Sequence, residues 1–375
     1  MTISIHGEYE PVRYDTLNGT INKTEFQIRS GNTYIKYGLY AYDSLLLALK
    51  KPTVTEYNLP KQTEYVAERI DFKYPVPYHR KEPNVLLLDE AEYALDGGPF
   101  QKCDEILRIG AAVGRLLGYT RTDGTGAQPW IREKAEVTHF VMLRFRFYSE
   151  IETEAEYAFE EAEAVWLNGD EVVLTPNGWY VDRDIQRIRL PRIRIGENIL
   201  TVKVPVSEDI GPEPSYLLGD FDVRLQGTKK SIYPPSKTIG FGSITHQGLP
   251  FYGGNLVYET EIDTPHCTIE IRVGHYIGAL IQVLIDGKKS RKIVFPPYCV
   301  RVEGISQGKH KIQFILYGNR NNTFGSLHNL SHEKRFGPPY WYPDDNAFTC
   351  SYMLEGTGII SSPVITVLTD TNGMK

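Results

Sequence analysis

Apolar and polar residues alternate along most of this chain, and this period of two constrains its fold more than any other feature. Within residues 137–147, Val141, Leu143 and Phe145 share one face of an extended chain, and Arg144 and Arg146 share the other. The same alternation recurs at residues 33–40, 198–206, 269–273, 281–285 and 310–317. Because successive side chains of a strand point to opposite faces, this pattern predicts strands packed on one side only. We therefore expect an all-β fold of tandem antiparallel β-sandwiches.

The composition supports this expectation and excludes several classes of protein. The chain has 375 residues, with 33 Gly, 23 Pro and 25 Tyr, a balance typical of many short strands joined by turns. Its net charge of -6 argues against a nucleic-acid or anionic-membrane partner, which would need a basic face. The cysteines lack metal-binding spacing. Without a secretory leader or a long apolar run at any point, we expect a soluble protein, cytoplasmic by default.

One segment departs from the alternation. Ile106, Ile109 and Val113 follow helical spacing, and Gly118 suits a C-terminal cap. Asp104 and Glu105 stand where carboxylates favour the positive end of a helix. We predict one substantial helix near residues 102–117 and few others.

Proline-rich stretches suggest where the domains divide. Proline fixes φ and cannot donate to a sheet, so such stretches tend to fall between strands. They occur at residues 73–77 and 231–235. We expect an N-terminal sandwich portion at 1–80, a helix-bearing sandwich at 81–233 and a second sandwich at 234–375.

The second and third segments share a weak internal repeat. Each has a strand, an Asn-Gly or Asp-Gly turn (Asn168 or Asp286), another strand, and then a strand introduced by Gly196 or Gly308. Two copies of one sandwich would explain this repeat. The alternative is that any two antiparallel modules share such hairpins.

This repeated unit resembles galactose-binding-like (jelly-roll) sandwiches, in particular the sugar-binding domain of family 2 glycoside hydrolases. Longer stretches, at residues 84–89, 216–221, 248–254 and 317–329, are similar to the region after the catalytic barrel in large bacterial glycosidases of the α-L-rhamnosidase-like type. The resemblance covers Tyr9 to Val367. It implies accessory domains whose catalytic carboxylates lie on a separate (β/α)₈ barrel, for which this chain has no alternating strands and helices. The resemblance therefore carries over no catalytic residue, and Met1 falls where that barrel would already have ended. A barrel domain or chain is the implied protein partner.

Aromatic and polar residues late in the chain are the best candidates for sugar binding. An aromatic ring packs on the C–H face of a sugar, while planar polar side chains bond its hydroxyls. The candidate side chains are Tyr340, Trp341, Arg320, Asn321, His328 and, in the second segment, Trp179. The alternative is that these rings plug the ends of the sandwiches or cover an interface between them.

Acidic and histidine clusters offer weaker signals. The glutamates between Glu150 and Glu163 are typical of a solvated edge that protects a strand from unwanted pairing. Asp344, Asp345 and Asn346 have oxygen ligands for calcium, but a proline-led turn explains them without a metal. His328 and His332 are four residues apart without helical context, which favours a surface turn. We predict no cofactor, with structural calcium as the alternative.

These features favour a non-catalytic, carbohydrate-binding accessory region of a glycoside hydrolase. Two alternatives stay open. A complete glycoside hydrolase would place two carboxylates close together in a cleft. A purely structural interaction module would show a large apolar patch and bind no glycan.

Overall fold

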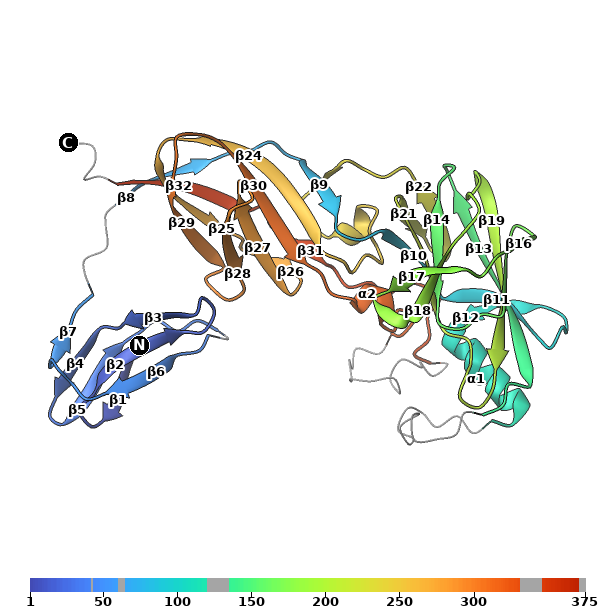
Figure 1. The fold of residues 1–375 in the computed structure, drawn as a ribbon, viewed down its shortest axis with the longest axis horizontal. Helices are drawn as coiled ribbons and strands as arrows, with labels where there is room; N and C mark the ends of the chain where they lie inside the picture. Colours follow the sequence, from blue (N-terminus) through green and yellow to red (C-terminus); the bar gives the residue numbers. More distant parts are fainter. Residues whose placement is uncertain (42, 60–64, 120–134, 331–345, 371–375) are drawn as a thin grey trace.

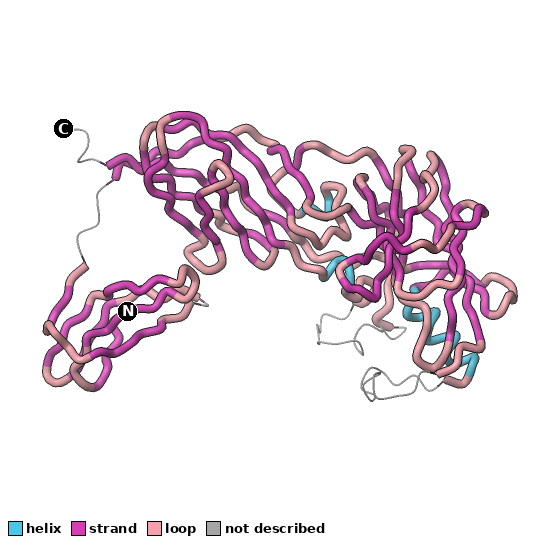
Figure 2. The backbone as a smooth tube through the Cα atoms, in the orientation of Figure 1, coloured by secondary structure: helices cyan, strands magenta, loops and turns pink. Residues whose placement is uncertain are grey.

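The computed structural model describes residues 1–41, 43–59, 65–119, 135–330 and 346–370, and it confirms the all-β prediction (Figures 1 and 2). Antiparallel sheets make up most of the described chain. Its helices are α1 (Ile106–Leu117), the short α2 (Asn321–Phe324) and the 3₁₀ turn η2 (Ile244–His246). Within the described ranges, no helix is both long enough and apolar enough to cross a membrane.

The N-terminal unit is a small pair of sheets. One sheet has the strand order β1-β5-β4-β7, and the other has the order β3-β2-β6. Phe26 and Ile35 are buried at its centre. Its strands are β1 (Thr2–His6), β2 (Glu10–Asp15), β3 (Thr20–Lys23), β4 (Phe26–Arg29), β5 (Asn32–Lys36), β6 (Leu46–Lys50) and β7 (Glu56–Tyr57).

The middle sandwich, residues 84–233, packs two larger sheets around one apolar core (β10 to β22 in Figure 1). One sheet runs β10-β20-β14-β18-β17; the other runs β12-β11-β13-β19-β15-β16, with β22 joining β13 and β21. Its strands are β10 (Asn84–Leu88), β11 (Glu90–Leu95), β12 (Gln101–Glu105), β13 (His139–Ser149), β14 (Ala155–Phe159), β15 (Ala164–Leu167), β16 (Asp170–Val172), β17 (Pro176–Tyr180), β18 (Asp182–Arg189), β19 (Gly196–Val206), β20 (Ser215–Gly219), β21 (Asp222–Gln226) and β22 (Lys229–Tyr233).

The C-terminal sandwich is formed by residues 65–80 and 238–370. Its main sheets run β23-β9-β24-β30-β27-β28 and β29-β25-β32-β8, and β26 pairs with β31. Its strands are β8 (Tyr65–Ile70), β9 (Val76–Arg80), β23 (Thr238–Ile239), β24 (Leu256–Thr264), β25 (Cys267–Arg272), β26 (Tyr276–Ile277), β27 (Leu280–Ile285), β28 (Lys289–Ile293), β29 (Cys299–Ile305), β30 (Gly308–Tyr317), β31 (Gly358–Ile359) and β32 (Val364–Asp370).

The pairing of β8 and β9 differs from the domain division expected at residue 80. Ile70 pairs with Ile365, and Tyr78 pairs with Tyr258, so both strands belong to the C-terminal sandwich. The middle sandwich is therefore inserted into the C-terminal one, between β9 and β23. Proline marks a break in a strand, but it does not say which sheet the preceding strand joins.

The two large sandwiches share one strand order. The path β11-β13-β19-β15-β16 matches β9-β24-β30-β27-β28, and β10-β20-β14-β18 matches β8-β32-β25-β29. The turns match as well: the Asn168 side chain accepts the N–H of Ile199 at 2.9 Å, and the Asp286 side chain accepts the N–H of Lys311 at 2.9 Å. Both turn residues have positive φ, 56° and 53°. This agreement supports two copies of one sandwich.

Helix α1 forms as predicted but begins later, because residues 101–105 pair with β11 as strand β12. Glu105 is the N-cap, and its side chain accepts the N–H of Arg108 at 3.0 Å. Gly118 ends the helix in the left-handed conformation, with φ 74°. Ile106, Ile109 and Val113 are buried in the core of the middle sandwich.

Residues from the C-terminal sandwich reach into the middle one. Arg320 binds both carboxylate oxygens of Glu82 at 2.7 Å, and Thr323 donates to the carbonyl of Phe251 at 2.8 Å. Phe251 is itself part of the middle core. The segment after β30 thus lies against the middle sandwich, where it helps to close the cavity described next.

Candidate functional site

A cavity of about 440 Å³ lies at one end of the middle sandwich. Its walls come from the start of α1, the connection before β18, the segment leading into β20, and residues 323–328 from the C-terminal sandwich. We call it the acid-lined cavity. Its lining residues are Leu87, Asp89, Glu105, Leu107, Glu160, Val181, Asp182, Asp184, Ile185, Glu213, Pro214, Tyr216, Thr323, Phe324, Gly325, Ser326, Leu327 and His328.

Two aromatic rings form part of the cavity wall. Tyr216 and Phe324 meet edge to face, with ring centroids 5.4 Å apart. Tyr180 packs behind both rings, 5.4 Å from Tyr216 and 6.1 Å from Phe324. Burial raises the pKa of Tyr216 and keeps its hydroxyl neutral. The wall is therefore an apolar surface that can pack against a flat ligand.

Carboxylates line the rest of the cavity. Glu105 is 6% exposed, and this burial raises its pKa to about 7, against the hydrogen bonds from the backbone at the start of α1. Desolvation and the neighbouring Asp184 and Asp182 raise the pKa of Glu160. Asp182 and Asp184 are exposed at the mouth. The cavity thus offers hydrogen-bond acceptors at its mouth and one carboxyl that is half protonated near neutral pH.

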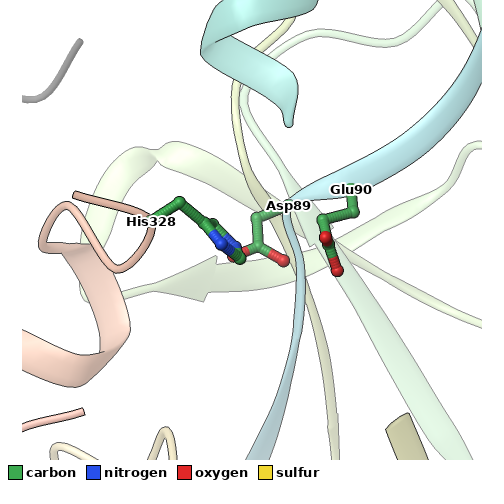
Figure 3. A group of neighbouring side chains, drawn as sticks. All are labelled: Asp89, Glu90 and His328. Atoms are coloured by element: carbon green, nitrogen blue, oxygen red, sulfur yellow. The ribbon is translucent and has the colours of Figure 1, made fainter. Parts of the chain in front are cut away.

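A buried charge network forms one side of the cavity (Figure 3). Asp89 lies beside His328, with Glu90 next along the chain. Lys230 donates to Asp89 at 2.6 Å, Tyr352 donates to the same oxygen at 2.6 Å, and Nε2 of His328 lies 3.3 Å from the other oxygen. The Asp89, Lys230 and His328 side chains are each no more than 6% exposed. The network joins residues more than two hundred positions apart, so it ties the segment after β30 to the middle sandwich.

The geometry indicates that His328 is an imidazolium. Its Nδ1 lies 2.8 Å from the carbonyl of Thr349, and its Nε2 faces Asp89, so both ring nitrogens have acceptors as partners. Burial alone would lower the pKa of His328, but the hydrogen bond to Asp89 raises it. Burial alone would likewise raise the pKa of Asp89, and the Lys230 ammonium and His328 hold that pKa well below its usual range.

Asp89, Glu90 and His328 also come close enough together to be considered as metal ligands. A metal would need a free imidazole nitrogen and carboxylate oxygens without a competing cation. The Lys230 ammonium lies 2.6 Å from Asp89 and 3.8 Å from Glu90, which is the position a cation would take. The donor set therefore suits an ion network better than a metal site.

The structure brings one of the predicted sugar-binding residues into this cavity. His328 lines it, but the ring is held by Asp89 and Thr349. Arg320 pairs with Glu82 and lies over Tyr180, 5.8 Å from the ring centroid. Asn321 is exposed at the start of α2. Trp179, 51% exposed on β17, is not among the cavity residues.

Other predicted residues lie outside the described part of the chain. These are Tyr340, Trp341, Asp344, Asp345 and His332. Asn346 is described and takes part in an interaction. The predicted aromatic loop and calcium ligands therefore stay predictions.

Four of the seven glutamates between Glu150 and Glu163 have basic partners. Glu156 pairs with Arg187 at 3.0 Å, and Glu163 pairs with Lys203 at 2.6 Å. Glu150 and Glu152 pair with Arg224 and Arg192 at 3.2 and 3.7 Å. These four form charge pairs along the surface rather than a catalytic pair, whereas Glu160 lines the acid-lined cavity.

Sequence reasoning did not identify Glu105, Glu160, Asp182, Asp184 or Phe324 as cavity residues. Glu105 marks the start of a helix in the sequence, as it does in the structure, and nothing local distinguishes it from other acids at helix starts. Strand β17 ends in Trp179-Tyr180, and only Val181 separates it from Asp182, a signal that could have marked a tight connection at the end of a sandwich. The remaining residues meet only through long-range packing.

Comparisons with known proteins add little to this geometry. No family profile and no curated protein matches the sequence. Among solved structures, the chain is similar to a rhamnosidase from Novosphingobium sp. PP1Y, with 12% identity and a TM-score of 0.26 over 63% of this chain and 23% of that one. It is also similar to a GH2 β-galacturonidase from Eisenbergiella tayi, with 10% identity and a TM-score of 0.23 over 62% of this chain and 36% of that one. These neighbours are glycosidases, the class of enzyme that the sequence also resembles. Their TM-scores are too low to support an inference.

Proposed function

We propose that this chain is a non-catalytic carbohydrate-binding region of the kind that accompanies glycoside hydrolases, and that the acid-lined cavity is its sugar site. The observation that carries the proposal is the meeting of the Tyr216 and Phe324 rings with the carboxylates of Glu160, Asp182 and Asp184 in one cavity. Rings pack against the C–H face of a sugar, and carboxylates accept hydrogen bonds from its hydroxyls.

The size of the cavity agrees with such a ligand. A volume of about 440 Å³ falls within the range of small-molecule sites and suits one or two sugar rings. The buried network of Asp89, Lys230 and His328 holds one wall in place, which lowers the cost of ordering that wall when a ligand binds.

One observation favours a second candidate, a glycoside hydrolase. Glu105 has a pKa near 7, as a general acid would need, and the ionised Asp89 lines the same cavity. Against this, Glu105 already caps α1, and Asp89 is already bound by Lys230, Tyr352 and His328. Both carboxylates therefore have structural roles, which favours binding without catalysis.

A glycan array followed by calorimetry on the strongest ligand tests the proposal. Phe324→Ala and the double variant Asp182→Asn/Asp184→Asn should each weaken binding by about tenfold or more. Trp179→Ala removes an exposed ring outside the cavity and should leave the affinity unchanged. Binding that survives the cavity variants, or no binding to any glycan, would overturn the proposal. Hydrolysis of aryl glycosides that disappears in Glu105→Gln would establish the hydrolase instead.

A further inference from the structure

A second and larger hollow lies between the middle and C-terminal sandwiches. It has a volume of about 920 Å³ and shares no lining residue with the acid-lined cavity. We call it the inter-sandwich groove. The lining residues that matter for a ligand are Tyr78, Glu154, Arg189, Arg192, Ser236 and Lys237.

Several charges in the groove neutralise one another. Arg80, whose side chain is 10% exposed, bonds the carbonyl of Phe221 at 2.9 Å and pairs with Asp220 and Asp222. Glu82 is paired with Arg320, and Glu156 with Arg187. These contacts hold the floor and sides of the groove and leave little net charge there.

The remaining charges are mostly positive. Arg189 and Lys237 are exposed, and neither side chain has a partner among the residues that the structure describes. Arg192 has only the exposed Glu152, 3.7 Å away. Glu154 is the carboxylate in the groove that lacks a described partner. The lining as a whole is neutral, with four basic and four acidic side chains, so its positive character is confined to the exposed Arg189, Arg192 and Lys237.

The groove also presents an aromatic ring and hydrogen-bonding groups beside these cations. Tyr78 lines it from β9, with its pKa raised to about 12 chiefly by burial, so its hydroxyl stays neutral. Ser236 and Glu154 offer further oxygens. A ring, free cations and hydroxyl-bonding oxygens together match a ligand that is flat, hydroxylated and negatively charged.

We propose that the inter-sandwich groove binds a saccharide that carries an anionic group, either a carboxylate or a sulfate. Arg189, Arg192 and Lys237 attract the anionic group, and the sugar ring packs against Tyr78. Glu154 accepts from hydroxyls and repels a continuous polyanion, which disfavours nucleic acids and acidic peptides. This site is distinct from the acid-lined cavity, so each proposal can fail without the other.

The first experiment screens the full chain against an array of uronate-bearing, sulfated and neutral glycans. The strongest anionic ligand is then titrated by calorimetry beside its neutral parent sugar and a poly-glutamate peptide. We expect the anionic glycan to bind, more weakly at high salt because the contacts are exposed, and the other two to bind at least about tenfold more weakly. No binding of any anionic glycan, or equal binding of the peptide, would overturn the proposal. A uronate or a sulfated ligand would identify the anionic group.

Charge variants then locate the site. Arg189→Ala/Lys237→Ala should weaken binding by about tenfold, whereas Lys229→Ala/Lys309→Ala removes the same charge from exposed positions elsewhere and should change it less than twofold. Glu154→Gln keeps an oxygen that accepts from the sugar hydroxyls and removes the charge that repels the anionic group. It should therefore tighten binding severalfold, a gain that misfolding cannot produce. Equal losses in the two double variants, or weaker binding by Glu154→Gln, would contradict the assignment. Asp182→Asn/Asp184→Asn should leave this affinity unchanged.

Discussion

The middle and C-terminal sandwiches have one strand order and different ends. In the middle sandwich, the connections before β15 and β18 help to line the acid-lined cavity of about 440 Å³. In the C-terminal sandwich, the corresponding connections before β27 and β29 enclose a hollow of about 230 Å³, with Tyr276 and Tyr298 in its wall. The two sandwiches have the same arrangement of strands, and the connections between the strands determine the size and the side chains of each cavity.

The two sandwiches also treat an equivalent acid differently. Asp89 directly follows β10, and Asp71 directly follows the matching strand β8. The side chain of Asp89 is 6% exposed and bound by Lys230 and His328, while that of Asp71 is 96% exposed. Burial of the first acid requires partners from β22 and from the segment after β30, and the C-terminal sandwich has no such segment laid over it in the described residues. The acid that follows the first strand of each sandwich is thus part of a buried ion network in the middle sandwich and exposed to solvent in the C-terminal one.

The largest expected effect separates these two acids. Asp89→Asn leaves the charges of Lys230 and His328 buried without their partner and should cost about 3–5 kcal/mol of unfolding free energy. Asp71→Asn should cost nothing measurable, because its charge is already in water. Urea unfolding of the two variants measures both losses of unfolding free energy. Equal losses would show that the buried partners of Asp89 do not contribute more to stability than the solvent around Asp71.

A second prediction concerns the buried N-cap of α1, which has no counterpart in the C-terminal sandwich. The pKa of Glu105 is raised from 4.5 to about 7, so its contribution to stability is complete below pH 4.5 and is lost as the pH rises through 7. Glu105→Gln keeps a cap oxygen without a charge and should be more stable than the unmodified protein at pH 8 by about 3 kcal/mol. Thermal unfolding at pH 4 and pH 8 gives this difference, with Glu261→Gln, an exposed acid of β24, as the control. A constant difference at both pH values would contradict the assigned pKa.

A third prediction uses the pH dependence of the charge network. The pKa of His328 is raised, so its stabilising charge is present below about pH 6.5 and is lost as the pH rises through the raised value. Glu105 also loses stability near neutral pH, so the test is made in the Glu105→Gln variant, where that loss is absent. In this variant, adding His328→Gln should remove the fall in unfolding free energy that remains above pH 6.5. His275→Gln, an exposed change in the C-terminal hollow, should leave that fall intact. Unfolding curves between pH 6 and 9 decide between these outcomes.

The smallest expected effect tests how far the two turns are interchangeable. Asp286→Asn gives the C-terminal turn the residue that the middle sandwich has at Asn168. It keeps an oxygen for the N–H of Lys311 and loses charge in the contact with His310. Because Asp286 is about half exposed, we expect a loss below about 1 kcal/mol in urea unfolding. A loss as large as that of Asp89→Asn would show that this turn, too, depends on a buried charge.

Much of the scaffold could be predicted because its signals are local. Alternation over 137–147 predicted β13, helical spacing predicted α1, and Asn168 and Asp286 predicted two turns of positive φ. The start of α1 was wrong by four residues, because pairing of residues 101–105 with β11 outweighs their local helical signal. The candidate site is much less predictable from the sequence. The side chain of His328 suggests a binding role, but its partner Asp89 is 239 residues away.

The amino-acid sequence by itself determined the class of fold, since period-two burial and turn residues act between near neighbours. Only the tertiary structure decided that β8 and β9 complete the C-terminal sandwich, that Arg320 pairs with Glu82, and that Asp89 is buried while Asp71 is not. These outcomes depend on which sheet edge remains open and on which distant segment covers an end of the sandwich. Because a charge or a strand edge is satisfied by whatever partner the fold brings to it, no local pattern can name that partner.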